Sequence, residues 1–125
     1  MSKTRQSQPI SLQPEAIKKI ALQALDKLKA EAVVVLDVRG YASFTDYMIF
    51  ASGKSTRHVK SIANEVIEAA KKAKLPPLGV EGEDVGEWIL VDLGDAIVHV
   101  MLPDTRQFYE LEKLWGEELC VMESS

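Results

Sequence analysis

The chain has 125 residues, 46% of them hydrophobic and 27% charged, with a formal net charge of -4 and a single cysteine. These values are typical of one globular domain whose core needs no disulfide or structural metal, and they exclude a disulfide-rich secreted scaffold. No apolar run is long enough to cross a bilayer, and residues 1–9 lack the apolar core of a signal sequence. We therefore expect a cytoplasmic protein without a membrane anchor.

The first half of the chain predicts a helix, two strands and a second helix. Pro14 suits the first turn of a helix whose apolar residues then recur at spacings of three and four. Residues 33–38 form a continuous β-branched run, as expected for a strand buried on both faces, and residues 46–51 form the next strand. A serine or threonine at residues 55–56 can cap the second amphipathic helix, which ends before Pro76.

The second half predicts a short strand, a loop and a hairpin. Val80 begins the short strand, and residues 81–86 read as a loop because they contain two glycines and three acidic residues. Residues 88–92 and 96–101 are strand-like runs, and between them Gly94 can adopt the positive φ that a tight hairpin needs.

This order of elements predicts an α/β fold in a single domain. Pro103 opens a final helix that reaches residue 116, so a mixed β-sheet should carry helices packed on its faces. We expect residues 1–12 to be a disordered tail, residues 13–116 to be the folded domain and residues 117–125 to be a C-terminal tail. Within that last tail, residues 119–122 are either inert or a short edge strand.

Charges of opposite sign are concentrated in consecutive stretches of the chain. Residues 54–74 carry six Lys or Arg against two acidic residues. From residue 75 to residue 105 there is no Lys or Arg, and the acidic residues are Glu81, Glu83, Asp84, Glu87, Asp92, Asp95 and Asp104. This second stretch should attract a basic protein surface and repel a phosphate backbone. The alternative is that these acids only keep a loop and hairpin ends in water.

Residues that could perform catalysis or bind a metal are scarce. His58, His99 and Cys120 have no metal-ligand spacing, so we expect no metal centre and no cofactor. We interpret His58 as a solvated surface residue. We favour a structural role for His99 as a hydrogen-bonded residue of the sheet, with membership of a recognition face as the alternative.

The turn at residues 53–57 ends like a phosphate-binding P-loop. Such a loop needs a glycine five positions before the Gly-Lys pair, and that position is Met48 within a strand-like run. A helix start with two hydroxyls and two cations could still hold an anion. The candidate anion-binding residues are Gly53, Lys54, Ser55, Thr56 and Arg57. A simple helix cap explains the same residues without a ligand, and we favour it.

Trp88 is the most informative single residue. In a strand, Trp88, Leu90 and Asp92 share one face, so a large aromatic side chain lies among acidic neighbours. That composition is typical of a protein-binding hot spot with a charged rim. Burial of Trp88 beneath a helix, as ordinary core, is an equally good interpretation of the pattern.

Three ordered segments also carry a family resemblance. They are residues 45–59, which begin TDYMIFASG, residues 80–100, which contain GEWILVDLGDAIVHV, and residues 106–115, RQFYELEKLW. Together, within residues 17–116, they resemble the Iojap family of ribosomal silencing factors.

The resemblance implies a mixed α/β fold related to nucleotidyltransferases but without their catalytic carboxylates. It implies a translation repressor that is not an enzyme and needs no cofactor. Such a protein binds the large ribosomal subunit through the fourteenth ribosomal protein of that subunit and blocks subunit joining under nutrient limitation. It also implies a homodimer in isolation.

The positions that match the family's binding motif coincide with the acidic, tryptophan-bearing stretch. They are Glu81, Glu83, Trp88, Asp92, Leu93, Gly94 and Asp95. Two other functions stay open. A nucleotidyltransferase-like enzyme would use the turn at residues 53–57 for phosphates. A direct RNA-binding protein would use the basic second helix, and the same face could also make a peripheral contact with ribosomal RNA in a silencing factor.

Overall fold

The computed structural model describes residues 13–40, 42–43 and 45–105, and the backbone of residues 121–124. In chain order, its elements are α1 (Pro14–Lys27), β1 (Glu31–Asp37), β2 (Tyr47–Ser52), α2 (Thr56–Lys72), β3 (Gly79–Glu81), β4 (Trp88–Asp92), β5 (Ala96–Met101) and β6 (Val121–Ser124). The predicted helix, strand and hairpin order is thus confirmed as far as residue 102. The predicted final helix begins at Pro103, but from residue 106 to residue 116 it lies outside the described residues.

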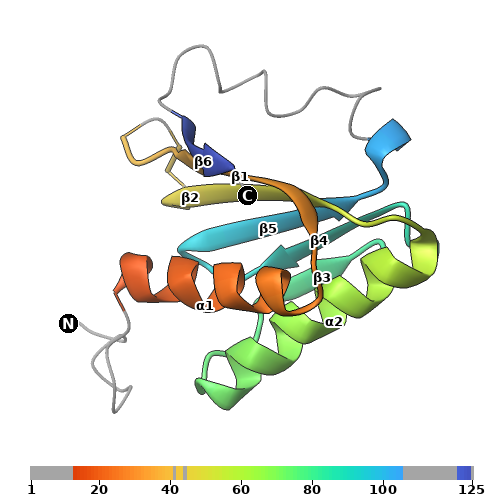
Figure 1. Ribbon diagram of the computed structural model, residues 1–125. Helices are drawn as coiled ribbons and strands as arrows, with labels where there is room; N and C mark the ends of the chain where they lie inside the picture. The colour runs from red at the N-terminus through yellow and green to blue at the C-terminus, as the bar shows by residue number, and fades with distance from the viewer. Residues whose placement is uncertain (1–12, 41, 44, 106–120, 125) are drawn as a thin grey trace.

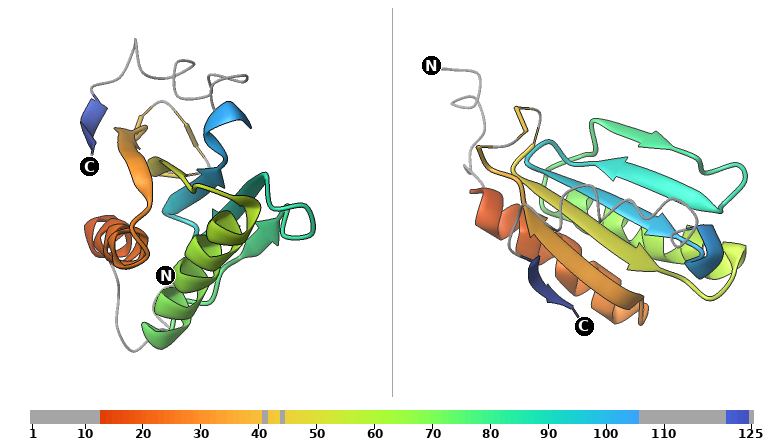
Figure 2. Two further views of the ribbon diagram at one scale, coloured as in Figure 1. Left: turned by 45° about the vertical axis from the view of Figure 1, so that its right-hand side comes forward. Right: turned by 90° about the horizontal axis from the view of Figure 1, so that it is seen from above.

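The strands form one mixed sheet in the order β3-β4-β5-β2-β1-β6 (Figure 2, right). β2 and β5 are parallel neighbours, whereas the other adjacent pairs are antiparallel. β2 and β5 are also the strands in which every residue is buried, as their central place predicts. The mixed α/β sheet expected from the sequence is confirmed.

Both described helices lie side by side on one face of the sheet, below it in Figure 1. Their apolar stripes meet the same strand residues, including Val35, Ile49 and Val98, in one large hydrophobic cluster. The sequence predicted helices on the faces of the sheet, without deciding which face each one covers. Helical periodicity gives the apolar side of a helix but not the face of the sheet that it meets.

The starts of the two helices follow from local sequence. α1 begins with proline at its first position, where a missing N–H costs no hydrogen bond. Ser55 caps α2, and its hydroxyl accepts a hydrogen bond from the backbone N–H of His58 at 3.1 Å. The predicted cap is confirmed, and Ser55 provides it.

A second hydrophobic cluster lies on the opposite face of the sheet. Its buried members are Leu36, Val38, Met48, Phe50, Ile97 and Met101. Trp88 and Leu90 of β4 are partly buried against it. The alternation predicted for β4 is therefore confirmed, because Ile89 and Val91 point instead to the helix-covered face.

The C-terminal strand completes the sheet at the β1 edge. β6 pairs antiparallel with β1, with Val34 opposite Ser124 and Leu36 opposite Val121. Part of the stretch expected to be a C-terminal tail is therefore an edge strand, the alternative that the sequence left open. Residues 119 and 120 lie outside the described residues.

Candidate partner-binding surface

The seven residues predicted to bind a partner fall into two groups at opposite ends of β4. Glu81, Glu83 and Trp88 lie at the start of β4, and we call them the Trp88 group. Residues 92–95 form the connection from β4 to β5, which we call the acidic turn. From Trp88 to Asp92 the strand advances about 13 Å. The structure thus spreads the predicted site along one strand instead of gathering it at one point.

The Trp88 group combines an exposed acidic loop with a partly buried indole. Glu81, predicted to begin the loop, is instead the last residue of β3, and both it and Glu83 are exposed. Val85 is 63% exposed in the loop of residues 82–87, which we call the acidic loop. Trp88 packs its ring against the second hydrophobic cluster and is partly accessible to solvent. An aromatic side chain in this position offers apolar area and one N–H donor beside negative charge. The sequence did not single out Val85, although a lone valine among acids and glycines is a visible signal.

Two glycines fix the loop that precedes Trp88. Gly82 has a φ of +87°, and a Cβ there would lie 2.1 Å from the carbonyl oxygen of Trp88. Gly86 has a φ of +81°, and its Cβ would lie 2.7 Å from Cε of Lys60 and 3.3 Å from Cβ of Thr56. Only glycine fits such close approaches at positive φ. The acidic loop is therefore packed against both the start of β4 and the first turns of α2.

The acidic turn is held by hydrogen bonds to its own backbone and to β2. Asp92 accepts the backbone N–H of Gly94 on Oδ1 at 2.8 Å, and Gly94 has a φ of +92°. The carbonyl of Asp95 accepts the backbone N–H groups of Asp46 at 3.1 Å and Tyr47 at 3.0 Å. The hairpin predicted from its glycine is confirmed. One carboxylate of the turn thus has a structural role in addition to its charge.

Of the two leucines at the acidic turn, Leu93 is buried and Leu78 is exposed. Leu93 was predicted to contact a partner, but it is only 3% exposed and packs in the helix-side cluster. Its side chain therefore holds the turn in place rather than offering a contact surface. Leu78 is 75% exposed, and its Cδ1 lies 3.5 Å from where a Cβ of Gly94 would be. Because Leu78 follows two prolines outside any strand pattern, the sequence reasoning missed this apolar neighbour of the turn.

The donors of the candidate anion-binding turn are largely used within the protein. The backbone N–H of Lys54 donates to Nδ1 of His58 at 2.9 Å, and Ser55 caps the helix. The ammonium group of Lys54 lies 3.7 Å from a carboxylate oxygen of Glu31. Gly53 is buried, and a Cβ there would lie 2.9 Å from the backbone nitrogen of Val59. These contacts favour the helix-cap interpretation of residues 53–57 over a phosphate cradle.

His58 is a structural link rather than the solvated residue that we predicted. Its Nδ1 accepts from Lys54, so Nε2 carries the proton and donates to the carbonyl of Leu28 at 2.8 Å. Leu28 is the C-cap residue of α1. The ring therefore connects the end of α1 to the start of α2. Sequence periodicity could not reveal this contact, because it joins residues that are far apart in the chain.

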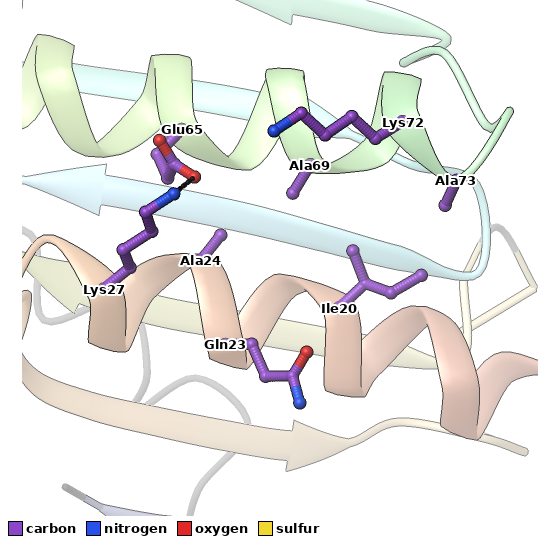
Figure 3. A pocket seen from close by; sticks show the side chains of 8 residues that line it. All are labelled: Ile20, Gln23, Ala24, Lys27, Glu65, Ala69, Lys72 and Ala73. Carbon is purple, nitrogen blue, oxygen red and sulfur yellow. Dashed lines mark ion pairs between the residues drawn. The ribbon is translucent and has the colours of Figure 1, made fainter.

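One open groove, of about 390 Å³, lies between α1 and α2 (Figure 3). Its lining residues are Ile20, Gln23, Ala24, Lys27, Glu65, Ala69, Lys72 and Ala73. Lys27 and Glu65 form an ion pair across it, with 3.2 Å between nitrogen and oxygen. The groove contains no residue of the Trp88 group or the acidic turn. A single carboxylate in its lining does not provide the paired ligands that two-metal chemistry requires.

Two other kinds of site are absent from the described part of the chain. No three His, Cys, Asp or Glu side chains among the described residues lie close enough together to hold a metal ion. No helix within those residues is both long and apolar enough to cross a membrane.

Comparison with known proteins shows the family to which the whole chain is similar. The model of the family described as "Ribosomal silencing factor during starvation" matches residues 11–124. A ribosomal silencing factor from Haemophilus influenzae is 46% identical over 101 residues, which are 81% of this chain and 99% of that protein. A crystal structure of a Chromobacterium violaceum protein has a TM-score of 0.82 and 43% identity, covering 84% of this chain and 88% of that one.

A eukaryotic relative has a name that refers to ribosomes as well. The mouse protein "Mitochondrial assembly of ribosomal large subunit protein 1" is 39% identical over 89 residues. These residues are 69% of this chain and 39% of the mouse protein. Because the family model spans nearly the whole sequence and close relatives match over most of their length, the chain belongs to the family of ribosomal silencing factors.

Proposed function

We propose that this protein silences ribosomes by occupying the large subunit at the face where the small subunit joins. Its contact is a basic surface of the fourteenth ribosomal protein of the large subunit. Membership of the silencing family supports the role. The observation that carries the choice of surface is Trp88, partly exposed on the face opposite the helices and next to an acidic loop.

The charge distribution supports a basic protein as the partner. Glu81, Glu83, Asp84 and Glu87 are all exposed, and residues 75–105 contain no Lys or Arg, so the acids outnumber the one lysine, Lys60 of α2, whose side chain packs against Gly86. Such a surface accelerates association with a cationic partner and disfavours direct approach to RNA phosphates. Lys71 and Lys72 lie in the last turn of α2, away from the first turns that the acidic loop contacts, so a peripheral contact of these lysines with ribosomal RNA is compatible with this docking.

The mechanism is steric, so it needs no chemical step. A domain bound at the intersubunit face occupies volume that the small subunit requires, and joining is blocked for as long as the domain stays bound. The protein thereby acts as a cytoplasmic repressor of translation rather than as an enzyme. In isolation it forms a homodimer, which sedimentation equilibrium of the purified chain would test.

The decisive experiment is sedimentation of the purified protein with separated ribosomal subunits. We expect it to migrate with the large subunit, to be absent from the small-subunit fraction, and to reduce the joined particle when both subunits are present. A protein that stays at the top of the gradient would contradict the proposal. Binding to the isolated, purified fourteenth protein, measured by calorimetry, then tests the partner separately from the subunit.

A further inference from the structure

His99 is a buried polar side chain that the proposed function does not use. It lies on β5, is 6% exposed, and points to the same face of the sheet as Ile97 and Met101. Burial of an imidazole among apolar residues costs free energy unless its nitrogens are hydrogen bonded. Its position therefore requires an explanation from its contacts.

One nitrogen of His99 holds the indole of Trp88. The indole Nε1 lies 3.1 Å from Nδ1 of His99. An indole N–H can only donate, so Nδ1 is the acceptor and the neutral ring carries its proton on Nε2. Burial lowers the pKa of His99 to about 4, which keeps the ring neutral and its Nδ1 lone pair available near pH 7.

The same ring is fixed from its other side by Phe50. The two rings stack with centroids 4.9 Å apart and planes inclined by 12°. Phe50 and His99 are direct partners in the parallel β2–β5 pairing, and Trp88 is the diagonal neighbour of His99 across the antiparallel β4–β5 pairing. A row of three rings thus crosses three strands, with Phe50 supporting His99 and His99 supporting Trp88.

The second nitrogen of His99, Nε2, makes no hydrogen bond within the described part of the chain although the atom is buried. A buried N–H without an acceptor is destabilising, and an apolar side chain of similar size would avoid that cost. What an apolar residue would not provide is the acceptor for Trp88.

We infer that His99 is a positioning residue for recognition: through Nδ1 it holds the Trp88 indole in the orientation that the ribosomal partner contacts. This inference rests on the proposed function, in which Trp88 is part of the interface. An indole that is already fixed loses less side-chain freedom on binding than one that rotates freely. The backbone of Gly82 lies close to the carbonyl oxygen of Trp88, and the His99 ring accepts the hydrogen bond of its side chain.

Two amide substitutions separate positioning from packing. In His99→Asn an amide atom can occupy the place of Nδ1, whereas in His99→Gln the amide extends to the place of Nε2. If His99 positions Trp88, His99→Asn should preserve binding better than His99→Gln, because only the asparagine keeps an acceptor near the indole. A purely structural role predicts the reverse, since Gln fills more of the buried volume and leaves a smaller cavity.

The first readout is the side-chain N–H signal of Trp88 in ¹⁵N-labelled full-length protein. Trp88→Phe identifies the signal, because Trp115 gives the only other indole resonance. We expect the signal in His99→Asn to keep a shift and a protection from exchange close to those of the parent protein. In His99→Gln the signal should move and exchange faster with water.

The second readout is affinity for purified large subunits, with both variants checked for folding by circular dichroism. We expect about fivefold weaker binding for His99→Gln and less than about twofold for His99→Asn, as loss of one hydrogen bond predicts. If His99→Gln binds large subunits as tightly as His99→Asn and leaves the indole signal unchanged, the inference is overturned. If Trp88→Ala itself binds normally, the proposed interface fails, and the role of His99 in recognition fails with it.

A third measurement needs no substitution and therefore does not depend on any variant folding. Long-range ¹⁵N–¹H correlations of the histidine ring report which nitrogen carries the proton. The geometry requires Nε2–H with Nδ1 unprotonated at pH 7. A ring protonated at Nδ1 could not accept from the indole, and that result would refute the inference.

Discussion

Both faces of the sheet bury apolar side chains, but the face opposite the helices also carries a row of rings that reaches solvent. On the helix-covered face, aliphatic residues such as Ile49, Ile62 and Val98 fill one large cluster and are fully buried. On the opposite face, the rings of Phe50, His99 and Trp88 lie in a row that ends at a partly exposed indole. The comparison suggests that one face mainly stabilises the fold and the other prepares a surface for recognition.

If the faces differ in this way, substitutions on each should affect different measurements. Changes on the helix-covered face should lower the free energy of unfolding while the folded fraction still binds. Changes on the opposite face should weaken binding more than they weaken folding. The following predictions run from the largest expected effect to the smallest.

Truncation of Ile62 should cause the largest loss of stability. This residue of α2 is fully buried in the helix-side cluster, and Ile62→Ala should cost about 3 kcal/mol through lost burial and an unfilled cavity. Urea unfolding followed by circular dichroism gives the value. At a temperature where the variant is still folded, its affinity for large subunits should match that of the parent protein. A weakened affinity would break the division between the faces.

Truncation of Trp88 should have the opposite profile. We expect Trp88→Ala to weaken binding to the large subunit about thirtyfold, which corresponds to roughly 2 kcal/mol for a central aromatic contact. Because the ring also packs against the second hydrophobic cluster, a smaller loss of stability should accompany this change. Co-sedimentation at several protein concentrations measures the affinity. Retained binding would remove β4 from the interface.

Lowering the pH should reduce the stability of the protein, because His99 is buried in its neutral form. His99 in the unfolded chain takes up a proton near pH 6.5, but in the folded protein burial lowers its pKa to about 4. Between these values the unfolded state binds more protons. The free energy of unfolding should therefore fall as the pH is lowered from 6.5 toward 4, by up to about 1.4 kcal/mol per pH unit.

His99→Asn provides the control for this pH dependence, because it lacks the titrating ring. Glu15 and Asp37 also have lowered pKa values, caused first by hydrogen bonds from Tyr47 and Arg39 respectively. Their contributions are lost at lower pH in both proteins and cancel in the difference. In urea titrations at each pH, the free energy of unfolding of the parent protein should fall relative to that of His99→Asn as the pH is lowered from 6.5 to 4. A parallel pH dependence in the two proteins would contradict the assignment.

Reversal of one exposed charge should have the smallest effect. Glu83→Lys, in the acidic loop, should slow association with the large subunit a few-fold at low salt, with the difference fading as salt screens it. Glu68→Lys is the matched control, because Glu68 is also an exposed glutamate but lies on α2, outside the acidic loop. Stopped-flow association rates at two salt concentrations would test the pair. Equal slowing in both variants would indicate an effect of net charge alone.

Local patterns predicted most of the elements and part of the candidate site. The cap at Ser55, the hairpin at Gly94 and the shared face of Trp88 and Asp92 follow from residue type and spacing. The prediction that Leu93 contacts a partner was wrong for its side chain, because the turn directs that side chain into the helix-side cluster. Alternation along a strand gives two faces but does not say which one helices cover.

The least predictable features are contacts between residues distant in the chain. His58 was expected to be solvated, yet it joins the ends of two helices through Leu28. His99 was expected to be a satisfied residue of the sheet, but only its bond to Trp88 is present among the described residues. Each of these facts depends on strand order and helix placement, which no window of sequence contains.

The sequence by itself determined which segments are helices and strands, where acidic charge accumulates and which residues share a face of β4. These properties follow from side-chain periods of about 3.6 and 2 residues and from local turn chemistry. Only the tertiary structure decided that β5 lies between β2 and β4, which brings Phe50, His99 and Trp88 into one row. Strand order depends on the free energy of the whole packed sheet, so it appears only when distant segments meet.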